Sequence, residues 1–255
     1  MNQLRRIQLT ELEILKFIDK TCEELGLKYS LGGGSMLGAI RHKGFIPWDD
    51  DVDLYMSLSD FKKLKKSFKS EQYFLQTPST DIEVPFSMCK IRKNGTYMPE
   101  PEMDRLNINN GIWIDIFLYT NAAKSKSLQK IQYNIYKLLK TYRCRYYHLN
   151  NKDAGIFHKI CCKLPRRVQV RLDSFIVGII SMLGSKNSDQ YFCFDVGKNY
   201  FYKKTMFDEL EKYDFEDTCF WGLKDYDAYL NMLYGPDYMT PKKWGHIDNY
   251  DNVIV

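Results

Sequence analysis

The sequence of 255 residues lacks the marks of secreted, zinc-binding and membrane-spanning proteins. Its seven cysteines are odd in number and include no C-x-x-C pair, which argues against a disulfide framework or a zinc site and favours reduced thiols. The N-terminus has no apolar stretch of the kind found in signal peptides. The longest apolar run, Phe175 to Leu183, is too short to cross a bilayer. We therefore expect a cytoplasmic protein.

Charge of one sign is not in large excess either. The 37 basic and 32 acidic residues give a net charge of +5, which suits an anionic substrate or an anionic membrane surface. That charge is too small to indicate a nucleic-acid partner, and none is expected. Hydrophobic residues make up 44% of the chain, so it can form a core. The length fits one compact domain, with or without a helical appendage.

One stretch, LGGGSMLGAIRHKGFIPWDDDVDL at residues 31–54, concentrates polar residues that a core does not need. Residues 51–56 alternate polar and apolar, which predicts a strand with Asp51 and Asp53 on one face. Two carboxylates so close repel unless a cation or proton lies between them, and hard oxygen ligands select Mg²⁺ or Mn²⁺. A solvated acidic loop is the alternative, but such a loop has no reason to alternate with buried residues. The aspartates of the stretch are Asp49, Asp50, Asp51 and Asp53.

A glycine turn opens the same stretch. A short strand at 28–31 leads into Gly32-Gly33-Gly34, and Ser35 is expected to cap a helix over 36–40. Backbone N–H groups at such a helix N-terminus suit a phosphate group. The lysine of a P-loop and the last glycine of a G-x-G-x-x-G motif are both missing. A tight strand–helix turn without a ligand is the alternative.

A strand, a glycine turn, a helix and a strand carrying Asp-x-Asp, in this order, resemble the layout of the nucleotidyltransferase fold. The run GSMLGAIRHKGFIPWDDDVDL at 34–54 resembles the signature of the LicD family of phosphotransferases, which includes the fukutin-related proteins of animals. The segment DYDAYLNMLYGPDYMTP at 225–241 resembles a C-terminal motif of that family, so the resemblance extends over the full length. His246 falls where many members carry a histidine, and its role stays open.

The resemblance implies a metal site. Asp51 and Asp53 would hold Mg²⁺ or Mn²⁺ together with Asp115, whose IDIF setting matches the third acidic position of the family pattern. An aspartate in a strand as apolar as 111–117 is costly unless it is paired or metal-bound, although a buried capping aspartate is the alternative. These three residues are the predicted catalytic residues. Asp115 or Asp49 is the candidate to accept the proton of the attacking hydroxyl.

The resemblance also implies where the donor binds. Residues 84–98 are predicted to form a hairpin around Asn94-Gly95, with strands at 86–92 and 96–98. Lys90 and Arg92 share one face of its first strand and would face the donor's phosphates, or else be two exposed basic residues on an edge strand. The other predicted substrate-binding residues come from the central stretch: Gly33, Gly34, Ser35, Arg41, His42, Lys43, Trp48 and Asp49.

The expected fold class is α/β, a nucleotidyltransferase-like mixed sheet flanked by helices, with a helical insert. We divide the chain into a catalytic core at 1–122, the insert at 123–188, and a C-terminal part at 189–255 that completes the same domain. The insert is basic and tyrosine-rich, and it either packs as a cap, covers the acceptor site or lies against anionic lipid. Helices are predicted over 8–26 (capped by Thr10 and ended by Gly26), from 59, and over 125–150, 165–183 and 225–234; strands are predicted at 73–76, 191–194, 200–204 and 215–221.

The function that the resemblance implies is metal-dependent transfer of a phospho-substituent to a sugar hydroxyl, with release of CMP. Phosphocholine from CDP-choline is the expected group, and a cell-surface glycan (lipopolysaccharide, teichoic acid or capsule) or its lipid-linked precursor is the expected acceptor. A choline head group needs an aromatic cage, for which Trp48, Trp113 and Tyr97 are available. The alternatives are glycerol phosphate or ribitol phosphate from a CDP-polyol, true nucleotidyl transfer with loss of pyrophosphate, and a non-catalytic binding protein. Peripheral contact with the inner face of the cell membrane is compatible with each.

Overall fold

A computed structural model describes residues 1–84, 89–100, 103, 106–143, 164–194, 200–241, 250 and 252–255, with the side chains of 138–143 left out. The last part of the helix predicted at 125–150, the start of the strand predicted at 86–92, and His246 all lie outside the described residues.

Helix α1 (Gln3–Leu25) is longer than the sequence predicted. The side chain of Asn2 accepts a hydrogen bond from the Arg5 N–H and caps the helix, so the predicted start at residue 8 and the predicted Thr10 cap are wrong. Thr10 lies buried inside the helix, because the apolar face already includes Ile7. Gly26 ends the helix in the left-handed conformation with φ 62°, as predicted.

The main sheet is mixed and follows the order β1-β2-β5-β4-β3. Strands β2 and β5 run parallel, and the other pairs on this path are antiparallel. Strands β6 and β7 extend the sheet from the later half of β5. The strands are β1 (Tyr29–Leu31), β2 (Asp53–Ser57), β3 (Tyr73–Gln76), β4 (Cys89–Lys93), β5 (Trp113–Asn121), β6 (Gln190–Cys193) and β7 (Phe201–Lys203). This arrangement confirms the predicted α/β class with a mixed sheet.

The predicted hairpin around Asn94-Gly95 is wrong. The turn is present after β4, but β4 pairs with β3 along one edge and with β5 along the other. Both edges are therefore taken, and the chain after Gly95 cannot fold back onto β4. Tyr97 pairs instead with Ile254 in an isolated antiparallel bridge.

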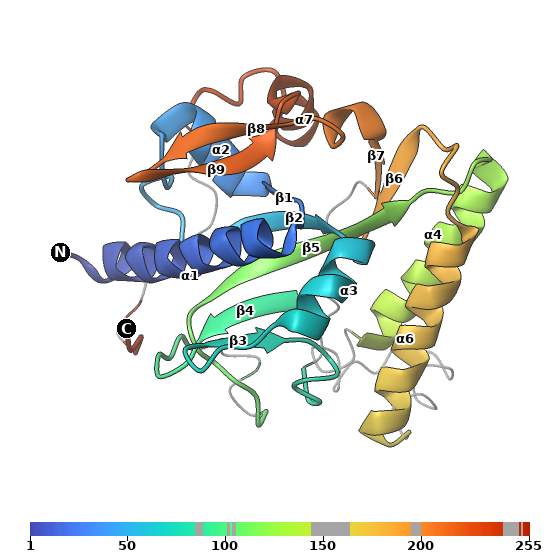
Figure 1. Cartoon of the computed structure of the whole chain (residues 1–255), viewed down its shortest axis with the longest axis horizontal. Coiled ribbons are helices and arrows are strands. Elements are labelled where there is room, and N and C mark those ends of the chain that lie inside the picture. The colour runs from blue at the N-terminus through green and yellow to red at the C-terminus, as the bar shows by residue number, and fades with distance from the viewer. Residues whose placement is uncertain are drawn as a thin grey trace, which may run out of the picture.

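The helices flank this sheet at three places. Figure 1 shows α1 and α3 in front of it, and both contact β5. Helices α4 and α6 lie side by side on the right of the view, between β5 and β6 in the chain. Helices α2 and α7 lie at the top of the view, beside the small β8–β9 sheet. The bounds are α2 (Gly33–His42), α3 (Leu58–Ser67), α4 (Lys126–Arg143), α6 (Arg166–Leu183), the 3₁₀ turn η2 (Lys204–Met206), β8 (Leu210–Phe215), β9 (Thr218–Leu223) and α7 (Tyr226–Tyr234).

These elements confirm the predicted helices to within a few residues, apart from the start of α1 and that of α2. The sequence missed β8 and predicted the other late strands. The boundaries at 122 and 188 stay predictions. Among the described helices, none combines the length and the apolarity needed to cross a membrane.

Candidate active site

Two predicted site residues stand side by side on neighbouring strands. Asp53 begins β2 and lies opposite Asp115 of β5 in the parallel register. The Asp115 N–H donates to the Val52 carbonyl oxygen at 2.8 Å, which locks this register at the end where the aspartates lie. Asp51 precedes the strand, so the predicted strand over 51–56 starts two residues too early.

The glycine turn lies directly against these aspartates. Gly33 has φ 44°, and a Cβ there would overlap Asp53 Oδ2. A Cβ at Gly34 would lie 2.6 Å from Asp49 Oδ2. Only glycine lets the first turn of α2 approach the two carboxylates so closely.

The predicted capping role of Ser35 is wrong, because α2 begins at Gly33 and Gly32 takes the cap position. The Ser35 side chain has another function in the fold: its Oγ accepts a hydrogen bond of 2.9 Å from the Asp53 N–H. Ser35 therefore ties the glycine turn to the start of β2.

A pocket of about 230 Å³ opens at this point. Its walls hold six of the predicted site residues: Gly34, Arg41, Trp48, Asp49, Asp51 and Asp53. The sequence missed four residues of the opposite wall, which follow or end α7: Tyr234, Asp237, Tyr238 and Thr240. The signal for them was the C-terminal motif at 225–241, which supported the resemblance but was given no place in the site.

The three basic residues at the C-terminal end of α2 differ in their surroundings. Arg41 reaches the pocket, and its Nη1 donates to the Tyr238 carbonyl oxygen at 2.8 Å. His42 accepts from Arg41 Nε and packs edge-on against Trp48, with ring centroids 6.2 Å apart. Lys43 is exposed at the C-terminal end of α2 and is absent from the pocket wall. Binding roles for all three residues stay predictions.

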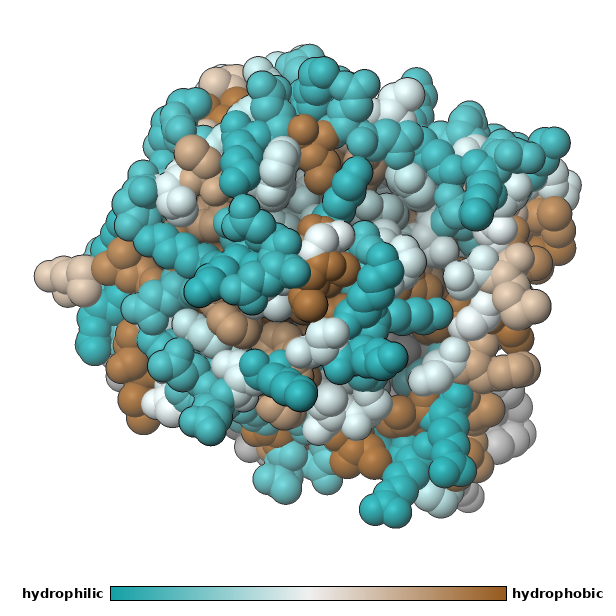
Figure 2. Space-filling model, viewed as in Figure 1, coloured by the Kyte–Doolittle hydropathy of each residue, from teal (hydrophilic) through white to brown (hydrophobic). Residues whose placement is uncertain are grey.

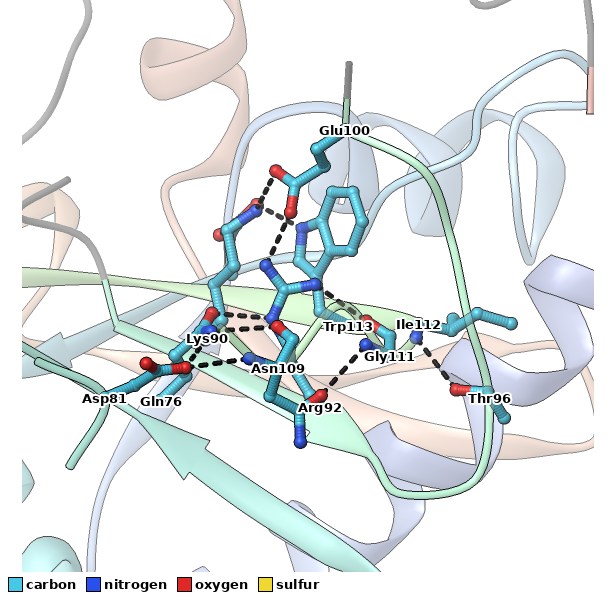
Figure 3. A network of polar contacts seen from close by, with 11 residues as sticks. Gln76, Asp81, Lys90, Arg92, Thr96, Glu100, Asn109, Gly111, Ile112 and Trp113 are labelled. Atoms are coloured by element: carbon cyan, nitrogen blue, oxygen red, sulfur yellow. Dashed lines mark hydrogen bonds and ion pairs between the residues drawn. The ribbon is translucent and has the colours of Figure 1, made fainter. Parts of the chain in front are cut away.

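Lys90 and Arg92 are buried, so the alternative of two exposed residues on an edge strand is wrong. Figure 3 shows both side chains meeting Glu100: Lys90 Nζ lies 3.1 Å from Oε2, and Arg92 Nη2 lies 2.5 Å from Oε1. Arg92 also donates to Gln76 Oε1 at 2.6 Å and to the Gly111 carbonyl oxygen at 2.8 Å. Each guanidinium nitrogen of Arg92 therefore has a protein partner.

This network continues to Asp115 through Trp113. Lys90 Nζ lies 3.7 Å and the Arg92 guanidinium carbon 4.8 Å from the Trp113 ring centroid. The indole N–H of Trp113 donates to Asp115 Oδ2 at 3.0 Å. Asp115 Oδ1 is buried without a hydrogen bond, and its nearest cation is Lys90 Nζ at 3.9 Å. The network orients Asp115 and leaves one carboxylate oxygen to be satisfied.

Negative charge is costly at this site. Burial, with the nearby charges of Asp49 and Asp115, raises the pKa of Asp51 to about 8. Burial also raises the pKa of Asp115, against the opposing effect of Lys90. A divalent cation among these groups would remove much of that cost, because it favours the ionised carboxylates.

The sequence missed Glu11, which it counted as part of a purely structural helix. Glu11 is 1% exposed, and its Oε2 has no hydrogen bond. Burial and then the charges of the nearby aspartates, Asp51 first, raise its pKa well above the ordinary value. One turn earlier, Gln8 Nε2 donates to the Asp49 carbonyl oxygen at 2.8 Å. This face of α1 therefore borders the loop of residues 49–51, which we call the aspartate loop. The only sequence signal is a glutamate among the apolar positions of α1.

The donor set fits Mg²⁺ or Mn²⁺ in chemistry. The carboxylates of Asp51, Asp53 and Asp115 are hard oxygen ligands, and the buried Oδ1 of Asp115 needs a partner. In the described part of the chain, no three His, Cys, Asp or Glu side chains are already arranged as a complete metal-ligand group. A metal site is therefore a proposal that rests on the chemistry of these oxygens.

Adjacent aspartates on a parallel strand pair, facing a glycine turn at a helix start, define a site of the nucleotidyltransferase class. Residues 26–133 match the family model described as LicD/FKTN/FKRP, nucleotidyltransferase domain. This match over residues 26–133 confirms the resemblance to the LicD family that the sequence predicted.

Two relatives show how far this similarity extends. The chain is 28% identical over 256 residues to the lipopolysaccharide cholinephosphotransferase LicD of Haemophilus influenzae, covering 92% of this chain and 91% of that protein. It is 48% identical over 48 residues to the ribitol 5-phosphate transferase FKRP of Homo sapiens, covering 19% of this chain and 10% of that protein. The first similarity spans both chains, and the second covers only a short segment.

Proposed function

We propose that this protein transfers a substituted phosphate group, phosphocholine from CDP-choline, to a sugar hydroxyl of a cell-surface glycan or its lipid-linked precursor. The observation that carries the proposal is the pocket where Asp49, Asp51 and Asp53 face the first turn of α2. In the proposed reaction the hydroxyl oxygen bonds to the phosphorus of the choline phosphate. The bond from that phosphorus to the bridging oxygen breaks, and CMP leaves.

The charged residues of the pocket, and Asp115 beside Asp53 on β5, each have a proposed task. Asp51, Asp53 and Asp115 would hold Mg²⁺ or Mn²⁺, which when bound neutralises charge on the donor's pyrophosphate. The guanidinium of Arg41, fixed by the Tyr238 carbonyl, would bind a phosphate oxygen from the pocket wall. Asp49 lines the same pocket and is the proposed acceptor of the hydroxyl proton.

The choice of choline is supported by the aromatic residues of the pocket. Trp48, Tyr234 and Tyr238 all line it, and aromatic faces are what a quaternary ammonium group binds. Two aromatic residues proposed from the sequence are less suitable. The Trp113 ring already contacts Lys90 and Arg92, and neither Trp113 nor Tyr97 lines the pocket.

Transfer of ribitol phosphate from CDP-ribitol is the second candidate. It is supported by the relatives named ribitol phosphate transferases, whose similarity is confined to about one fifth of this chain. A polyol would need hydrogen-bonding partners where choline needs aromatic faces. The full-length similarity to a cholinephosphotransferase favours choline.

The first experiment is a thermal-shift screen of the purified protein with Mg²⁺, Mn²⁺ or chelator against CDP-choline, CDP-glycerol, CDP-ribitol and CTP. A donor that binds the folded state raises the melting temperature by mass action. We expect the largest metal-dependent shift with CDP-choline. A shift with CDP-ribitol or CDP-glycerol alone would refute the choline proposal, and the absence of any metal-dependent shift would refute the catalytic proposal.

Product analysis then distinguishes the two reaction types. Release of CMP from CDP-choline indicates transfer of the choline phosphate, whereas release of pyrophosphate from CTP indicates nucleotidyl transfer. Trp48→Ala is expected to raise the KM for CDP-choline, since it removes one aromatic wall of the pocket. Trp221→Ala, outside that pocket, is the matched control and should leave the KM unchanged.

A further inference from the structure

Helix α6 carries an apolar stripe that faces solvent. The side chains of Val168, Leu172, Phe175 and Met182 are exposed, Phe175 by 66% and Met182 by 85%. With the half-buried Ile179 they follow each other at steps of four and three residues, which places them on one face of the helix. We call these five residues the α6 stripe.

The opposite face of α6 already has its packing partners. Gln169, Asp173 and Ile180 are buried, and α6 packs against α4. Packing inside the protein therefore accounts for one face of the helix and leaves the α6 stripe to solvent. Figure 2 shows hydrophobic side chains gathered at the right-hand edge of this view, where α4 and α6 lie.

Positive charge accompanies the stripe. The sequences of α4 and α6 contain eight basic residues and one acidic residue, a net charge of +7. The whole chain has a net charge of only +5, so all of its excess positive charge resides in this helix pair. The exposed Arg167 and Arg171 lie on α6 itself, along one side of the stripe, and the exposed Lys130 and Lys137 lie on α4.

An apolar stripe bordered by arginines is the pattern of a helix that lies in the plane of a membrane surface. Anionic lipid headgroups attract the basic residues, while the apolar side chains enter the boundary of the acyl chains. The acidic pocket belongs to the part of the molecule around α2 and α7, away from the α4–α6 pair (Figure 1). Contact through α6 would thus turn the basic α4–α6 pair toward the lipid. The pocket would stay uncovered by the membrane.

We propose that the α6 stripe, with Arg167 and Arg171, binds this protein peripherally to an anionic membrane. The proposal is independent of the donor that the pocket accepts. It concerns the surface of the bilayer, since no helix among the described residues is suited to cross one.

The test is co-sedimentation of the full chain with vesicles. Vesicles of phosphatidylglycerol mixed with phosphatidylcholine are compared with vesicles of phosphatidylcholine alone, at low and high salt. We expect binding to the anionic vesicles that weakens as salt rises. The double variants Phe175→Ser/Met182→Ser and Arg167→Glu/Arg171→Glu should each bind about tenfold or more weakly.

Matched controls come from α1 and α3, outside the α4–α6 pair. Leu25 is exposed by 40% and Lys20 is exposed on the same helix, α1. Leu25→Ser should bind vesicles like the wild type. Lys20→Glu/Lys63→Glu changes the net charge as much as the double arginine variant, and it should bind much more tightly than that variant does.

Several outcomes would overturn the proposal. They are equal binding to neutral and anionic vesicles, no binding to either, and anionic binding that the α6 variants leave unchanged. A soluble dimer that Phe175→Ser/Met182→Ser dissociates, seen by analytical ultracentrifugation without vesicle binding, would assign the stripe to a second copy of the chain. Because all of the substituted α6 side chains are exposed, circular dichroism should show an intact fold in both double variants.

Discussion

Replacing Arg92 by methionine tests whether this buried arginine supports the fold or binds the donor. Arg92→Met keeps an unbranched apolar side chain but removes three nitrogen contacts: Gln76, Gly111 and Glu100. Glu100 retains Lys90 Nζ at 3.1 Å, so its charge is not left wholly unpaired. Removing one partner of a buried ion pair costs about 3–5 kcal/mol, and the remaining lysine points to the lower end of that range.

We therefore expect Arg92→Met to lower the free energy of unfolding by about 3 kcal/mol. For a chain of this size that corresponds to a fall in melting temperature of roughly 6–12 °C. Urea titration monitored by circular dichroism measures the first quantity, and calorimetry measures the second. Lys63→Met is the control, since its exposed pair with Asp60 should contribute under about 1 kcal/mol.

The pH dependence adds a second measurement. Although burial opposes them, the charges of Lys90 and Arg92 hold the pKa of Glu100 below its ordinary value of 4.5. A lowered carboxylate pKa stabilises the folded state above the ordinary pKa, and this contribution is lost as the pH falls through the folded-state pKa. The stability difference between wild type and Arg92→Met should therefore narrow below about pH 4.5.

Two results would refute this reasoning. A loss of less than about 1 kcal/mol would mean that the buried contacts of Arg92 add little to the fold. A stable variant that no longer binds the donor would return Arg92 to the phosphate-binding role that the family resemblance implied.

Three further predictions concern the pocket. Gly33→Ala should destabilise the protein by about 1–2 kcal/mol and lower turnover, because the added methyl group would overlap Asp53 Oδ2 and φ at this position is positive. Gly178→Ala is the control, since a Cβ there meets no neighbour, and thermal melts should show it to be neutral or slightly stabilising. Asp53→Ala should abolish CMP release with the circular dichroism spectrum unchanged, and retained turnover would exclude the proposed metal role. The pKa of Asp51 is raised from 3.8 to about 8, so between these pH values the folded state holds a proton that the unfolded state has lost. The free energy of unfolding of the metal-free protein should therefore fall as the pH rises through this range, as urea titrations at several pH values would show. A flat pH profile over that range would contradict the close packing of the aspartates.

The sequence predicted the central stretch well because its signals are local. The glycines mark the turn from β1 into α2, although Gly33 and Gly34 already belong to the helix, and of the two alternating aspartates only Asp53 lies in β2. The structure places the turn and the aspartates in contact, as the order of the elements implied. Where Asp115 would lie could not be deduced from local pattern, and its assignment came from the family resemblance.

The wrong and missing predictions occur where contacts with distant parts of the chain decide the structure, because a local sequence pattern does not contain those contacts. Asn94-Gly95 is a strong hairpin signal, but both edges of β4 are taken by β3 and β5, which lie elsewhere in the chain. From the sequence, a glutamate on α1 is expected to face solvent. In the structure it is buried, because the aspartate loop packs against that helix. Glu11 is therefore found only from the tertiary structure.

The parallel pairing of β2 with β5 also affects how the protein becomes active. Strands β3 and β4 lie between this pair in the chain, so Asp53 and Asp115 meet only after a long loop has closed. Such closure is slow compared with the formation of helices and local turns. During refolding, helical signal should thus return well before turnover does. The rate at which activity recovers would therefore measure the rate at which β2 pairs with β5, and not the rate of the earlier collapse.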